Sequence, residues 1–300
     1  MDSFLAPGVA LTPLEGGWSG ETFVADAGGE RTVVRIYADP RHSEHAAEIT
    51  ASLLGLVRGL LPVPQVLEVR RRSPDGEMPA LLVTDLLPGV RGDLVLPTLD
   101  DDGLRRAGEA VGEVAATLAG MPRLRAGLFV DGDLNVEPFD TDLPAWVEQH
   151  RTDLERQDWS GGEVSRLSAL AERAQGLLDT VGRVSLVHSD LNPKNLLLDP
   201  ESLAVTGVLD WEFAHSGHPF TDLGNVLRFD RAPAYEAGVL GAWEARLGTA
   251  PRDARTLARC ADLFALVDLA SRSGANPVAT RAEAQLRAVV TDDDWHAVPG

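Results

Sequence analysis

Cysteine and lysine are nearly absent from this 300-residue chain, and apolar runs long enough to span a membrane are absent altogether. Cysteine occurs once, at Cys260, so the chain cannot form an internal disulfide, and a reducing compartment suits it. No apolar run approaches the roughly 18 residues that a membrane-spanning helix needs. The first residues, "MDSFLAPGVAL", also lack the basic and apolar segments of a secretory signal. We therefore expect a cytoplasmic protein that does not associate with membranes.

Lysine also occurs only once, at Lys194, although the chain holds 27 basic residues. Acidic residues number 46, which gives a formal net charge of −19. A nucleic-acid partner is excluded by this sign, because binding to phosphates requires a positive surface. The acidity is consistent with simple solubility and also with a cationic small-molecule partner. Because arginine replaces lysine everywhere else, the retained lysine is the more informative basic residue.

The hydrophobic pattern changes from strand-rich to helix-rich near Gly89. Residues 22–26 and 32–37 alternate and contain β-forming residues, whereas residues 42–60 have apolar residues at helical spacing. This pattern predicts an α+β protein of two lobes, residues 1–88 and residues 89–300. Further strands are expected in residues 80–89, 183–188, 195–199 and 204–210, and helices in residues 99–120, 142–157, 163–181, 221–229, 233–247, 254–273 and 280–289.

Two polar turns interrupt the strands of the second part of the chain. Residues 186–198 read "LVHSDLNPKNLLL", and "DWEFA" begins at Asp210. Asp190 and Asn195 lie in a proline-containing turn between two strands, and Asp210 ends the next strand. Two carboxylates and an amide oxygen are hard ligands of the kind that Mg²⁺ binds. Each residue alone is also a common turn former, but the combined pattern indicates a metal site.

The segments "HSDLNPKN" and "VLDWE" closely resemble the signature of the aminoglycoside phosphotransferase family, and the resemblance extends over nearly the whole chain. It implies a bilobal protein-kinase-like fold. Residues 1–88 would form a nucleotide-binding lobe with a small five-stranded antiparallel sheet, and residues 89–300 a mainly helical catalytic and substrate-binding lobe. It also implies transfer of the γ-phosphate of ATP or GTP, with Mg²⁺, to a hydroxyl group of a small molecule.

The resemblance gives each residue of the two turns a role. Asp190 would face the acceptor hydroxyl as the catalytic carboxylate, while Asn195 and Asp210 would hold Mg²⁺ on the phosphates. His188 would pack the catalytic loop, and Asp222 in "GHPFTDLGN" would hold that loop in place. Phosphoryl transfer has a loose transition state, so the enzyme mainly positions groups and neutralises charge.

Lys194 stands four residues after the catalytic aspartate and directly before Asn195. A compact ammonium group in this loop could reach the transferring phosphate and stabilise its developing charge. An exposed loop lysine in an ordinary ion pair is the alternative. Because the chain has lost its other lysines, we expect a catalytic contribution from Lys194.

Nucleotide binding is expected from segments of the first lobe. "GGWSGETF" matches the family's nucleotide loop by its position, although hairpin turns use the same residues. "LLVTDLLPG" matches the hinge, where main-chain atoms would pair with the base, so side chains there cannot distinguish ATP from GTP. The residues expected to bind nucleotide are Ser19, Gly20, Arg35, Glu48, Thr84 and Leu86.

Arg35 is a departure from the family, which usually has lysine at this position of the third strand. Arginine can bind phosphate in a bidentate manner, but its planar group is larger than an ammonium group. Its expected partner is a glutamate on the following helix, and Glu48 matches the family spacing better than Glu44. The alternative is a surface arginine and a solvated glutamate.

The acceptor is the least defined part of the prediction. Ammonium groups need anionic or carbonyl partners when they leave water, so carboxylates of the second lobe are candidates for a cationic antibiotic. The candidates are Glu212, Asp262 and Asp268; the last two lie six residues apart, so only one is expected to line the site.

Other readings remain open at this point. The acceptor could be a macrolide or a metabolite such as a sugar, an amino alcohol or an amino acid. A nucleotide-binding pseudokinase is conceivable because of Arg35, although Asp190, Asn195 and Asp210 are all present. A protein kinase is disfavoured because no "DFG … APE" arrangement follows Asp210. We expect a monomer.

Overall fold

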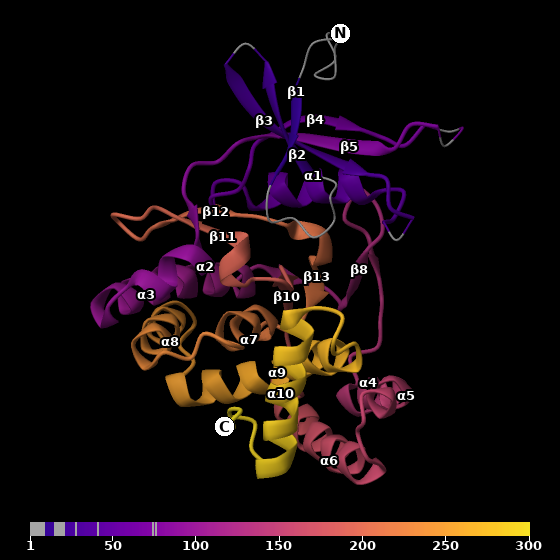
Figure 1. Ribbon diagram of the computed structural model, residues 1–300, viewed down its shortest axis with the longest axis vertical. Helices are drawn as coiled ribbons and strands as arrows, with labels where there is room; N and C mark the ends of the chain where they lie inside the picture. Colours follow the sequence, from indigo (N-terminus) through magenta and orange to yellow (C-terminus); the bar gives the residue numbers. More distant parts are fainter. Residues whose placement is uncertain (1–9, 15–21, 28, 41, 74, 76) are drawn as a thin grey trace. The chain divides into compact units, whose positions relative to one another are not determined.

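The computed structural model describes residues 10–14, 22–27, 29–40, 42–73, 75 and 77–300. It divides the chain into two compact units (Figure 1). The first unit comprises Met1–Thr98, Leu128–Glu137 and Pro193–Ala214, and the second comprises Leu99–Gly127, Pro138–Asn192 and His215–Gly300. The units are therefore discontinuous in sequence, unlike the single boundary after residue 88 that the hydrophobic pattern suggested.

An antiparallel sheet of five strands, in the order β1-β2-β3-β5-β4, forms the centre of the first unit. Its strands are β1 (Ala10–Pro13), β2 (Thr22–Ala27), β3 (Glu30–Tyr37), β4 (Val66–Arg70) and β5 (Ala80–Asp85). β5 lies between β3 and β4 and is buried along most of its length, which explains its apolar run from Ala80 to Val83. The predicted α+β class and the small five-stranded antiparallel sheet are thus confirmed.

A second, three-stranded sheet explains why later segments belong to the first unit. β11 (Leu196–Leu198) lies between β12 (Val205–Val208) and β6 (Val90–Arg91), so main-chain hydrogen bonds join residue 90 to residue 198. β8 (Gly127–Phe129) and β9 (Val136–Glu137) pair with each other as an antiparallel hairpin. The short helices here are α2 (Gly92–Val95), η1 (Leu96–Thr98), η2 (Pro193–Asn195) and η3 (Trp211–Phe213).

Helix α1 (Ala46–Val57) packs against β4 and β5 and has two distinct faces. Thr50 is buried, and its Oγ1 accepts a hydrogen bond of 3.2 Å from the hydroxyl group of Tyr37 on β3. Successive helical residues are separated by about 100°, so Glu48 lies on nearly the opposite side of the helix from Thr50. The side of α1 that carries Thr50 therefore faces β3.

The second unit is mainly helical, and its strand β10 (Val184–Val187) pairs with β7 (Pro122–Arg123) and β13 (His215–Gly217). Helix α3 begins after Asp100, whose side chain accepts from the N–H of Gly103, and a capping box starts α6. The helices are α3 (Asp101–Ala119), α4 (Leu143–Gln149), α5 (Arg151–Arg156), α6 (Gly161–Leu178), α7 (Thr221–Leu227), α8 (Pro233–Leu247), α9 (Pro251–Ser271) and α10 (Pro277–Asp292).

Helices α3 and α8 pack so closely that their backbones are in contact at three glycines. A Cβ atom built on Gly108 would lie 2.3 Å from the carbonyl oxygen of Tyr235, and one on Gly112 would lie 2.5 Å from that of Val239. From the other helix, a Cβ atom on Gly238 would lie 2.2 Å from the carbonyl oxygen of Arg105. The contact requires glycine at all three positions.

Cys260 lies within α9 and is buried. Burial raises the pKa of its thiol to about 12, which makes it unreactive at neutral pH. Within the described part of the chain, no helix has the length and apolarity needed to cross a membrane.

Candidate active site

The β11–β12 hairpin brings Asn195 and Asp210 to the same end of the three-stranded sheet. Leu196 pairs with Val208, and the N–H of Leu209 donates a hydrogen bond of 2.9 Å to the carbonyl oxygen of Asn195. Asn195 precedes the first strand and Asp210 follows the second, so the two predicted metal ligands flank one ladder. Asp210 is left-handed, with φ of 64°, which turns the chain from β12 into η3.

These two residues fit a magnesium ion by their donor chemistry. An amide oxygen and a carboxylate are hard donors, and Mg²⁺ is usually held by one or two such groups together with water and substrate phosphates. The side chain of Asp210 is 33% exposed, so a ligand can reach it from solvent.

Arg35 of β3 is bound by both acidic residues of the "DWE" segment. Its Nη1 donates a hydrogen bond of 2.6 Å to Oδ1 of Asp210, and its Nη2 donates to Oε2 of Glu212. Only 14% of the arginine side chain and 18% of the Glu212 side chain are exposed. Glu212, which we expected to bind the acceptor, therefore pairs with Arg35.

The electrostatic environment keeps Arg35 charged. Burial alone would lower the pKa of its guanidinium, but the carboxylate of Asp210, the Tyr37 side chain and Glu212 outweigh that effect, so the pKa rises. The guanidinium also lies 5.3 Å from the centre of the Tyr37 ring. A fixed cation is thus held directly beside one of the two predicted metal ligands.

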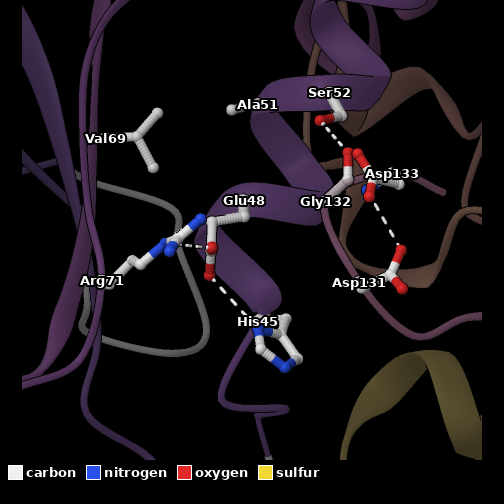
Figure 2. A pocket seen from close by; sticks show the side chains of 9 residues that line it. All are labelled: His45, Glu48, Ala51, Ser52, Val69, Arg71, Asp131, Gly132 and Asp133. Atoms are coloured by element: carbon white, nitrogen blue, oxygen red, sulfur yellow. Dashed lines mark hydrogen bonds and ion pairs between the residues drawn. The ribbon is translucent and has the colours of Figure 1, made fainter. Parts of the chain in front are cut away.

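Glu48 is not the partner of Arg35, which corrects our expectation. One oxygen of Glu48 accepts from Nε of Arg71 at 2.5 Å, and the other lies 3.4 Å from Nδ1 of His45 (Figure 2). The reason is the orientation of α1, because the face that carries Glu48 points away from the one that contacts Tyr37. The sequence spacing located the helix correctly but not its rotation.

Glu48 instead lines a separate pocket of the first unit, with a volume of about 580 Å³. The hydroxyl group of Ser52 donates a hydrogen bond of 2.5 Å to the carbonyl oxygen of Gly132, which joins α1 to the β8–β9 turn. The lining residues are His45, Glu48, Ala51, Ser52, Val69, Arg71, Asp131, Gly132 and Asp133 (Figure 2).

Asp190 belongs to the second unit, in the loop after β10. Its Oδ1 accepts a hydrogen bond of 2.7 Å from the side chain of Asn192, and its own N–H donates to Nδ1 of His188 at 3.3 Å. His188 is fully buried. It therefore has no access to an acceptor molecule, whereas Asp190 is half-buried.

A buried carboxylate from α7 holds this loop. Asp222 accepts hydrogen bonds from the N–H of His188 at 2.9 Å and from the N–H of Ser189 at 2.8 Å. Ser189 has φ of 69°, a conformation that the two bonds help to maintain. Burial raises the pKa of Asp222, while His188 and the two N–H donors act in the opposite direction.

A second network beneath the loop includes residues that sequence reasoning missed. Asn225 accepts from the N–H of Leu191 at 3.3 Å, and its amide donates to Oδ1 of Asp262 at 3.4 Å. Asp262 in turn binds Nη2 of Arg228 at 2.7 Å and Nε at 3.0 Å. Nothing in the sequence around Asn225 and Arg228 indicated that they bind Asp262 or the loop.

Asp262 is therefore a structural residue rather than an acceptor ligand, contrary to one of our two alternatives. It is 2% exposed and both of its oxygens are engaged by Arg228. Burial opposes the charge of Arg228, but Asp262 raises the pKa of its guanidinium above the ordinary value. Asp268 is 42% exposed and pairs with Arg272 one helical turn later.

The remaining predicted residues have varied positions. Lys194 is half-buried in η2, directly before Asn195. Thr84 lies opposite Val33 and Val66 inside the five-stranded sheet, so its main chain belongs to the ladder, whereas Leu86 follows the end of β5. Ser19 and Gly20 lie outside the described residues.

Comparison with solved structures shows the same fold in other proteins. A thermostable mutant of aminoglycoside phosphotransferase APH(4)-Ia, in a ternary complex with ADP and hygromycin B, has a TM-score of 0.66 at 20% identity and covers 94% of each chain. The aminoglycoside-3'-phosphotransferase of type VIII has a TM-score of 0.55 at 23% identity and covers 86% of this chain and 94% of its own. At these identities the likeness concerns the fold.

The curated relatives are longer proteins, and this chain matches only a segment of each. Acyl-CoA dehydrogenase family member 10 of Mus musculus is 27% identical over 186 residues, which are 60% of this chain and 16% of that protein. Acyl-CoA dehydrogenase family member 11 of the same species is 38% identical over 55 residues, which are 18% of this chain and 7% of that protein. The chain thus corresponds to a small part of these relatives.

A family model matches the chain as well. The model of the phosphotransferase enzyme family matches residues 10–263, which include both polar turns, Arg35 and the loop-holding Asp222. Most of the chain is covered by this match, from the first strand of the five-stranded sheet to the middle of α9. The chain therefore belongs to the phosphotransferase enzyme family.

Proposed function

We propose that this protein is a Mg²⁺-dependent O-phosphotransferase that moves the γ-phosphate of ATP or GTP to a hydroxyl group of a small cationic molecule. The observation that carries this proposal is the end of the β11–β12 hairpin, where Asn195 and Asp210 flank one ladder and Asp210 contacts the cation Arg35. Hard oxygen donors beside a fixed positive charge are suited to polyphosphate.

In this proposal the chain's own residues position the reactants. Asp190 orients the acceptor hydroxyl and accepts its proton late in the reaction, as a loose transition state allows. Arg35 and Lys194 offer positive charge to the phosphates. A bound Mg²⁺, held by Asn195 and Asp210, would neutralise charge on the nucleotide phosphates.

The acceptor class is supported by charge and by the structural neighbours. A net charge of −19 favours a cationic partner. One neighbour is a complex with hygromycin B and ADP, and another, aminoglycoside 2'-phosphotransferase-IIIa, is a complex with GDP, so the neighbours leave both nucleotides open. We propose an aminoglycoside-type or other cationic antibiotic as acceptor.

A hydroxylated metabolite is the second candidate. The curated relatives are mammalian proteins named for acyl-CoA dehydrogenases, and this chain matches segments of them. In this second proposal the acceptor is a sugar, an amino alcohol or an amino acid.

A substrate panel tests the proposal. Nucleotide turnover should be measured with ATP or GTP and Mg²⁺ in the presence of aminoglycosides, macrolides, amino alcohols and sugars, with product identified by mass spectrometry. We expect turnover with a cationic acceptor whose KM rises with salt, because the Debye length falls from about 10 Å at 0.1 M to about 3 Å at 1 M. Efficient use of a neutral acceptor, with a KM insensitive to salt, would refute the cationic acceptor only. Nucleotide binding without any turnover would favour the pseudokinase.

Arg35 gives a second test of the nucleotide site. Arg35→Ala should weaken nucleotide binding by about 1–3 kcal/mol, because charged hydrogen bonds to the phosphates are lost. Arg35→Lys keeps the positive charge and should retain most of the affinity. Arg71→Ala is the matched control, because Arg71 is an ion-paired arginine on the opposite side of α1. An unchanged affinity in Arg35→Ala, measured by calorimetry, would mean that other groups hold the phosphates.

A further inference from the structure

We propose that Glu212 is the residue that positions Arg35 for the nucleotide phosphates, in place of the glutamate expected on α1. The inference rests on the proposed function, since it assigns a role within the same nucleotide site. The "DWE" segment then has two roles: Asp210 would bind the metal ion, and Glu212 holds the Arg35 guanidinium.

The contacts of Arg35 divide naturally between these two roles. Nη1 donates to Asp210 and Nη2 donates to Glu212, so both ends of the guanidinium are held. A metal ion held by Asp210 would share the charge of that carboxylate, so the attraction of Asp210 for Arg35 would fall. Glu212 then remains as the carboxylate that keeps the arginine in place.

Arg35 has a donor nitrogen that no described residue pairs with. Its Nε is buried and has no hydrogen-bond partner among the described residues. An unpaired buried donor costs about 1–3 kcal/mol, and a phosphate oxygen is an acceptor that forms strong charge-assisted bonds with arginine. The buried Nε therefore points to an anionic ligand beside the two ion pairs.

Glu48 cannot serve this role in the observed arrangement. Its carboxylate binds Arg71 at 2.5 Å and faces the pocket of Figure 2, while the opposite side of α1 contacts Tyr37 through Thr50. To reach Arg35, α1 would have to rotate and break the hydrogen bond between Tyr37 and Thr50. Helix α1 does pack against η3, which carries Glu212.

Calorimetry with a non-hydrolysable ATP analogue and Mg²⁺ tests the assignment on the intact protein. We expect Glu212→Gln to weaken nucleotide binding about tenfold or more, with partial recovery in Glu212→Asp. Glu68→Gln is the matched control, because Glu68 is a partly buried glutamate paired with Arg70 in the same unit and should leave affinity unchanged. Glu48→Gln tests the rival residue and should also have little effect.

A double-mutant cycle separates positioning from general structural damage. If Glu212 acts through Arg35, Glu212→Gln should have little further effect on affinity in an Arg35→Ala background. Independent, additive losses would overturn the inference, as would a large loss in Glu48→Gln together with none in Glu212→Gln. Failure of the wild-type protein to bind nucleotide would instead remove the proposed function, and this inference with it.

Discussion

Asp190→Asn should reduce phosphoryl transfer by about 10²–10⁴-fold, the usual contribution of a positioned general base, while nucleotide affinity stays close to that of the wild type. The amide has nearly the same size and can still pair with Asn192, but it cannot accept the proton of the acceptor hydroxyl. The loop itself should remain in place, because its main chain at His188 and Ser189 is held by Asp222 and not by the Asp190 side chain. Single-turnover rates and calorimetry measure the two effects.

Asp210→Asn is the matched comparison for this prediction. It should weaken binding of the Mg²⁺-nucleotide complex as well as the rate, since a carboxylate ligand is replaced by a weaker neutral donor. It also removes one of the two ion pairs of Arg35. Small and equal effects of both substitutions would contradict the assignment of Asp190 to the acceptor and Asp210 to the metal.

Asp262→Asn should destabilise the protein by about 3–5 kcal/mol, because removing one partner leaves the other charge buried and unpaired. The remaining charge is that of Arg228, which is 7% exposed. The loss should appear as a lower midpoint of thermal unfolding. The network also reaches Leu191 through Asn225, so hydrogen exchange of the loop amides should increase.

Asp268→Asn is the control on the same helix. Its pair with Arg272 is about half-exposed, and such surface pairs contribute only about 0–1 kcal/mol. Equal destabilisation by the two substitutions would contradict the buried network. A changed KM for the acceptor in Asp262→Asn, without lower stability, would restore Asp262 as an acceptor ligand.

The sequence predicted those features that depend on local pattern. The apolar periodicity of residues 233–247 gave the bounds of α8, and the two polar turns placed Asn195 and Asp210 at the ends of consecutive strands. The pairing of Arg35 was not predictable in the same way, because it depends on the rotation of α1. The sequence of a helix reveals which of its faces is apolar, but tertiary packing determines which residue each polar side chain contacts.

Two other differences have similar causes. The helix expected over residues 142–157 is two helices, α4 and α5, which meet at His150. The boundary expected after residue 88 is replaced by discontinuous units, because β6 is hydrogen-bonded to a strand more than one hundred residues later in the chain. Long-range pairing of short strands leaves almost no local signal in a sequence.

The close approach of α3 and α8 restricts how this chain can vary. Every single-base change of a glycine codon that alters the residue adds a side chain, and at Gly108, Gly112 or Gly238 that side chain would meet backbone rather than a movable group. The neighbouring helix would have to be displaced, because no rotamer change can relieve such a clash. In a library of random variants, these three codons should therefore be among the least tolerant in the second unit, even though none of them encodes a residue of the proposed reaction.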